Sequence, residues 1–173
     1  SGVGLGFGWD GTTLDKLGSG TLILDAANTY TGLTTVHDGK LVVGSSAASV
    51  AKIVGDVDVQ SGATLGGHGS IFGTATIGNG ATVAPGTSVG TLTVGQIVFQ
   101  TGSTYEFEAL TGTADKIVVS STLGSGDGSA TIDAGANLKI LYYPIHVSHD
   151  WSQPCHPVLT RGRSLPSRRS LTS

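Results

Sequence analysis

A short phrase recurs along the chain, and its spacing restricts the fold more than any other feature. Each copy has a glycine, two small or hydroxyl residues and one apolar or aromatic residue; the copies end at Leu65, Val83 and Tyr105. Their glycines lie 18 and 22 residues apart (80 − 62 and 102 − 80). Repeats of about 20 residues indicate stacked units, because one unit is too small to bury its own apolar face.

Apolar residues alternate with polar ones from Val57 onward, which predicts short β-strands with one buried face. The pairs expected to point inward are Val57/Val59, Ala75/Ile77, Leu92/Val94, Ile97/Phe99, Tyr105/Phe107, Ile117/Val119 and Leu138/Ile140. The residues expected to point outward are Asp58, Thr76, Thr93, Glu106 and Lys139. Strands begin at Leu14, with further strands expected at 21–24, 34–36 and 40–43.

These strands are too short for a large flat sheet, and a sandwich of hairpins would need two-residue turns between antiparallel partners. The repeat favours an all-β parallel β-solenoid of about six or seven turns over the first 141 residues. The 28 glycines fit its corners, where the backbone needs positive φ or close approach. Residues 44–52 are interpreted as a loop or a short helix between turns. Only the two end turns would have open strand edges.

Composition changes abruptly after Leu141. Residues 1–141 contain all five lysines, no arginine and 11 of the 12 acidic residues, whereas residues 142–173 contain four arginines and four of the five prolines. We therefore divide the chain into a frayed or truncated first turn at 1–13, a parallel β-helix at 14–141, and a basic tail at 142–173. The tail is predicted to be disordered and to be unrelated or out of frame.

Two blocks near the start carry a resemblance to a known family: Gly18-Ser19-Gly20-Thr21-Leu22 and Asn28-Thr29-Tyr30-Thr31-Gly32, followed by Gly39-Lys40-Leu41. Together they resemble the autotransporter-associated β-strand repeat of type V secreted passenger domains. The stretch up to residue 141 is similar to the C-terminal part of such passengers. The repeat positions expected to be structural are Gly18, Gly20, Asn28, Tyr30, Gly32, Gly39, Gly62, Gly80 and Gly102.

The resemblance implies a right-handed parallel β-helix displayed outside the outer membrane of a Gram-negative bacterium, or secreted. It implies a role as stalk or adhesin scaffold, with folding of the last turns helping export. Host-cell surfaces, matrix and self-association are the expected partners, and nucleic acid is not. The translocating β-barrel that the family would have is not recognisable here, and the start at Ser1 indicates an internal piece of a longer protein.

No residue pattern predicts catalysis. Gly124-Ser125-Gly126-Asp127-Gly128-Ser129 has the letters of a serine-protease core in the wrong order, and no nucleophile elbow is present. The alternatives are a solenoid enzyme acting on polysaccharide and a self-association module. The enzyme would need clustered acids and basic residues on one face. The acids are scattered, and arginine is absent before residue 142. We therefore expect a protein that is not an enzyme.

No metal or cofactor site is expected either. Gly66-Gly67-His68-Gly69-Ser70-Ile71 has isoleucine where a calcium-binding solenoid repeat has aspartate. Asp56 and Asp58 share one strand face, but two carboxylates are too few for calcium. The spacing of His146, His149, Cys155 and His156 matches no structural zinc pattern. Three aromatic residues, Trp9, Tyr30 and Phe72, are left between surface contacts with carbohydrate or protein and core positions.

Overall fold

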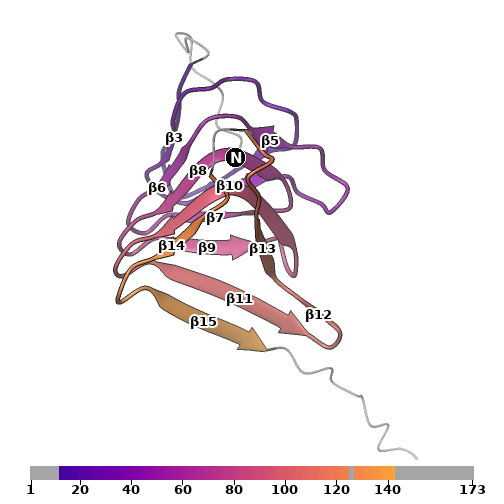
Figure 1. The fold of residues 1–173 in the computed structure, drawn as a ribbon, viewed down its shortest axis with the longest axis vertical. Coiled ribbons are helices and arrows are strands. Elements are labelled where there is room, and N and C mark those ends of the chain that lie inside the picture. The colour runs from indigo at the N-terminus through magenta and orange to yellow at the C-terminus, as the bar shows by residue number, and fades with distance from the viewer. Residues whose placement is uncertain (1–11, 125–126, 143–173) are drawn as a thin grey trace, which may run out of the picture.

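The computed structural model describes residues 12–124 and 127–142. All regular secondary structure in these ranges is β-strand. Nearly every strand pairing is parallel, and the chain returns to the same side once per turn (Figure 1). The fold is therefore a parallel β-solenoid, as the sequence predicts.

Three ladders of parallel strands form the walls of the coil. The first contains β1 (Leu14–Lys16), β3 (Thr34–Val36), β6 (Val57–Val59), the second halves of β8 (Ser70–Ile77) and β10 (Thr91–Phe99), and β14 (Ala130–Ile132). The second contains β2 (Thr21–Leu24), β4 (Lys40–Val43), β7 (Thr64–Gly67), β9 (Thr82–Pro85), β11 (Thr104–Leu110) and β15 (Asn137–Tyr142). The third contains β5 (Lys52–Ile53), the first halves of β8 and β10, and β13 (Lys116–Val119).

The coil has about five turns rather than the six or seven expected from the sequence. The period is not constant: the paired residues Leu14 and Thr34 lie 20 residues apart, whereas Ile97 and Ala130 lie 33 apart. The last turn is long mainly because residues 120–129 separate β13 from β14, where the preceding turn runs on within β10. A smaller addition comes from an antiparallel hairpin of β11 with β12 (Thr113–Ala114), which projects from the wall (Figure 1). A period taken from three phrases underestimates such a turn.

Mainly aliphatic side chains fill the core in registered columns. One column of the second ladder runs through Leu22, Leu41, Leu65, Val83, Tyr105 and Leu138. Leu41, Leu65 and Val83 are fully buried. Stacking of like residues in register gives each turn an apolar floor and ceiling, which a single turn could not make alone.

The inward assignment is correct for the four pairs from Val57/Val59 to Ile97/Phe99, whose side chains are buried. The final pair lies on the same face, in register with Tyr105 and Phe107, but Leu138 and Ile140 are 63% and 62% exposed. These two belong to the last described strand, and no further turn of the described chain covers them. Residues 44–52 contain turns and no helix, and Lys52 already belongs to β5.

Candidate functional site

The repeat glycines form a continuous corner of the coil. The N–H of Gly62 donates to the carbonyl oxygen of Gly80 at 3.0 Å, and that of Gly80 to the carbonyl oxygen of Gly102 at 3.1 Å. All three have positive φ, of 83°, 73° and 80°. A left-handed backbone at one corner of every turn therefore lets successive turns hydrogen-bond directly, and glycine meets this requirement without strain.

The other repeat positions are occupied by glycine for different structural reasons. Gly18 and Gly39 also have positive φ, of 71° and 69°. Gly32 lies outside the left-handed region, but a Cβ there would clash with the backbone of Thr12 in the neighbouring turn. Gly20 has neither requirement, since nothing lies within 4 Å of the position of its Cβ. The repeat thus combines corner positions, a position of close approach and one unconstrained position.

Asn28 and Tyr30 bind backbone and core rather than an external ligand. The Asn28 side-chain amide donates to the carbonyl oxygens of Ala26 at 2.9 Å and Lys52 at 3.2 Å, joining two turns. Tyr30 is buried, and its hydroxyl lies 2.7 Å from the Thr34 hydroxyl. Burial raises the pKa of the Tyr30 phenol. Of the three aromatic candidates, Tyr30 is therefore a core residue.

Polar side chains on the outer wall connect successive turns. His37 places Nε2 3.0 Å from an Asp15 oxygen and Nδ1 2.9 Å from the Gln60 side-chain oxygen, one turn to each side. A second row joins Thr74 to Gln96 at 3.0 Å. Gln96 in turn donates to the Ser129 hydroxyl at 3.0 Å. In these rows the groups that could perform acid–base chemistry bind their own neighbours along the coil.

The remaining aspartate and serine candidates do not converge. Asp56 accepts the Thr74 N–H at 2.7 Å, and the described residues contain no group of three or more histidine, cysteine or acidic side chains placed to hold a metal ion. Asp127 accepts hydrogen bonds from Ser129, which lower its pKa. The candidate Ser125 falls outside the described residues, as do Trp9, the set His146, His149, Cys155 and His156, and the basic segment Arg161–Arg169.

Phe72 borders a groove between turns. The groove has a volume of about 320 Å³ and is lined by Thr31, Val54, Gly55, Asp56, Phe72 and Gly124. The Lys52 ammonium lies 5.2 Å from the Phe72 ring centroid, a cation–π distance. One part of the ring is thus already in contact with a cation from the third ladder.

Asp115 is a buried charge that sequence reasoning missed. Only 5% of it is exposed, and its two carboxylate oxygens accept the backbone N–H groups of Gly90 and Glu108, each at 2.8 Å. It thereby fixes the base of the β11–β12 hairpin to the preceding turn. Its position directly after a two-residue strand offers no periodic signal, so only the tertiary structure identifies it.

The Tyr105 phenol should titrate late. Burial, followed by the nearby negative charge of Asp115, raises its pKa to about 12. Because the folded state holds the neutral phenol more strongly than the unfolded state, its contribution to stability is complete below about pH 10 and is lost as pH rises toward 12. A spectrophotometric titration of phenolate should show a high-pH phase from Tyr30 and Tyr105, of which Tyr105→Phe removes the part that titrates near pH 12. An unchanged high-pH phase in that variant would contradict the assignment.

The Passenger-associated-transport-repeat family matches residues 14–43. The chain is 36% identical over 128 residues to the "Extracellular serine protease" of Serratia marcescens, which covers 72% of this chain and 12% of that protein. It is 42% identical over 74 residues to the "Adhesin BmaC autotransporter" of Brucella suis biovar 1 (strain 1330), covering 43% of this chain and 2% of that protein. No solved structure matches the chain.

The fold and the hydrogen-bonded corner glycines define a β-solenoid built from repeats. The polar side chains described above form hydrogen bonds between its successive turns. Within that class, the chain carries an autotransporter passenger repeat. It spans about an eighth of the Serratia protein and a far smaller part of the Brucella protein. No helix among the described residues is long and apolar enough to cross a membrane.

Proposed function

We propose that the chain is a non-catalytic stalk and adhesin scaffold, displayed on the outer side of a bacterial outer membrane or released from it. The observation that supports this most directly is the use of the polar side chains. Asp15, His37 and Gln60 bridge three turns, and Glu106 binds Lys139 across two more at 2.7 Å. Such rows stiffen a rod along its axis, and they engage these polar side chains of the described residues with one another.

Two named relatives support different parts of this proposal. One is named an adhesin autotransporter and the other an extracellular serine protease. The protease match includes only 12% of that protein, so the shared part suits a supporting coil that is common to passengers with different activities. The same coil would serve as a folding stem, because each turn that forms provides the paired edge for the next.

A direct test compares turnover and binding by the same preparation. We expect no cleavage of protein or polysaccharide substrates by the 173-residue chain, and saturable binding to host cells or matrix proteins. Asp56→Ala and Asp58→Ala remove two carboxylates that could perform acid–base chemistry. His37→Ala removes the imidazole on the outer wall. Lys116→Ala, at an exposed position, is the matched control.

The outcomes separate the two function classes. Cleavage that is abolished by any of the three site variants and retained by Lys116→Ala would establish an enzyme and overturn the scaffold proposal. Binding without cleavage, unchanged in all four variants, would support a scaffold whose contacts lie elsewhere on the wall.

A further inference from the structure

The two ends of the coil differ in how well their inward side chains are covered. In the first turn Leu14 and Lys16 are 7% and 2% exposed. At the other end, Ile132 occupies the position in register with Lys16 through five pairings and is 71% exposed. In this ladder the inward side chains are therefore covered at the beginning and exposed at the end.

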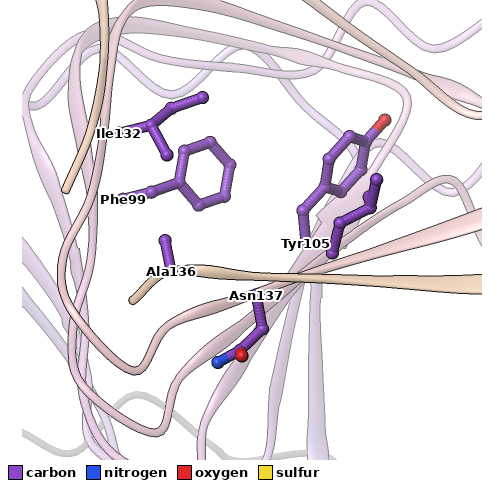
Figure 2. A pocket seen from close by; sticks show the side chains of 6 residues that line it. Phe99, Tyr105, Ile132, Ala136 and Asn137 are labelled. Atoms are coloured by element: carbon purple, nitrogen blue, oxygen red, sulfur yellow. The ribbon is translucent and has the colours of Figure 1, made fainter. Parts of the chain in front are cut away.

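The open end contains an apolar hollow. It has a volume of about 180 Å³ and is lined by Phe99, Tyr105, Ile132, Ala136, Asn137 and Leu138. Figure 2 shows Phe99 and Ile132 on one side and Tyr105 across from them. Phe99 and Tyr105 have their ring centroids 6.1 Å apart. The hollow is thus the exposed end of the core column itself.

The strand beside this hollow has a free edge of defined geometry. Among the described residues β15 pairs only with β11. The Asn137 N–H donates to the Ser103 carbonyl oxygen on the β11 side. Because successive residues of a strand direct their backbone groups to opposite neighbours, Leu138, Ile140 and Tyr142 direct theirs to the free edge. The same three side chains are 63%, 62% and 63% exposed.

These three residues are self-complementary about Ile140. In an antiparallel pairing of two β15 strands centred on Ile140, Ile140 faces Ile140 of the second copy and Leu138 faces Tyr142 of the second copy. In both of these pairs the backbone N–H and C=O groups of the two residues point toward each other across the free edge. This is the hydrogen-bonded pair of an antiparallel ladder. Tyr142 of the second copy would lie over the mouth of the apolar hollow.

The charges on β15 favour this register over its neighbour. A pairing centred on Lys139 would place two ammonium groups opposite each other, which is unfavourable. The pairing centred on Ile140 places Lys139 opposite Leu141 of the second copy. The Lys139 ammonium is also bound to Glu106 at 2.7 Å. A lysine on an edge strand usually discourages pairing with another chain, and this effect is weaker when its charge is already paired.

We propose that the occupant of this end is a second copy of the chain, which joins tail to tail through β15 about a two-fold axis at Ile140. A head-to-tail fibre is disfavoured because Leu14 and Lys16 of the first turn are already buried. An isologous contact closes on itself and gives a dimer. The dimer requires neither adhesion nor catalysis, so its test is independent of the test of the proposed function.

Sedimentation equilibrium over a range of protein concentrations tests it. The 173-residue chain, of 17.3 kDa, should approach twice its monomer mass. Ile140→Lys and Ile140→Glu should each be monomeric, since each places like charges at the two-fold axis, while far-UV circular dichroism stays unchanged. Ile23→Lys is the matched control, because Ile23 is also an exposed isoleucine of a terminal strand, β2.

An equal mixture of the two Ile140 variants should recover the dimer, because opposite charges then meet at the axis. A wild-type chain that stays monomeric at every concentration overturns the proposal. So does a dimer that Ile23→Lys disrupts as strongly as Ile140→Lys, and so does a failure of the mixed variants to associate. Larger open-ended assemblies of the wild type would contradict the two-fold contact and indicate head-to-tail stacking instead.

Discussion

Gly39→Ala should lower the free energy of unfolding by about 3 kcal/mol or more. Gly39 has φ of 69°, which an L-residue adopts only with strain. A Cβ at this corner would also lie 2.7 Å from the Gly18 carbonyl oxygen, and closer still to that of Gly20. These atoms belong to the backbone of the preceding turn and cannot rotate away, so the two turns would have to separate. Chemical denaturation followed by circular dichroism measures the loss.

Substitutions at two other repeat glycines distinguish the strain of a positive φ from the steric clash between turns. Gly62 has φ of 83° but nothing within 4 Å of its Cβ position. Gly62→Ala should therefore cost only the conformational strain, about 1 kcal/mol. Gly20 has neither strain nor contact, so Gly20→Ala should change stability by less than about 0.5 kcal/mol. Equal losses at Gly39 and Gly62 would show that close approach between turns contributes nothing.

The repeat phrase made the corners predictable because it records a local requirement. A glycine such as Gly80, which precedes two small residues and one apolar residue, is required by the φ of a single residue, whatever the distant partners are. Alternation likewise identified the inward face of β6 and β8, since side chains of a strand alternate whatever the strand pairs with. Local rules therefore sufficed for the fold class and for most of the core.

The features that the sequence did not indicate depend on where a residue lies along the axis of the coil. Leu138 and Leu65 have similar local patterns, yet one is 63% exposed and the other buried. Among the described residues, only Leu65 has a turn on each side. Asp115 lies at the β11–β12 hairpin, and the length of the last turn comes mainly from the residues between β13 and β14; both interrupt the period. A periodic pattern describes a typical turn, whereas ends and insertions are set by neighbours that it does not encode.

Lys16 is the clearest such case, because a lysine occupies an inward position of the core. It lies in register with Val36, in the column that continues through Val59, Ile77 and Phe99, and it is 2% exposed. Its ammonium donates to the carbonyl oxygens of Leu17 at 3.1 Å and Asp38 at 2.9 Å, and to that of Gly18. Three carbonyls around two successive corners thus share one buried cation.

Lys16→Ala is expected to lower the free energy of unfolding by about 3–4 kcal/mol, since it removes the hydrogen bonds and leaves a cavity. Lys16→Met retains most of the volume and leaves only the carbonyls without their donor, so about 1–3 kcal/mol is expected. Lys116→Met makes the same change at an exposed position and should cost less than about 0.5 kcal/mol. Denaturant unfolding of the three variants gives the order.

The opposing effect is the cost of desolvating an ammonium group, which methionine would avoid. If that cost dominated, Lys16→Met would be more stable than the wild type. We expect the reverse, because removing one partner of a buried polar cluster exposes the others to the full penalty of lost hydrogen bonds. Lys16 then acts as a pin between the Gly18 and Gly39 corners, and its loss should release the first turn before the rest of the coil unfolds.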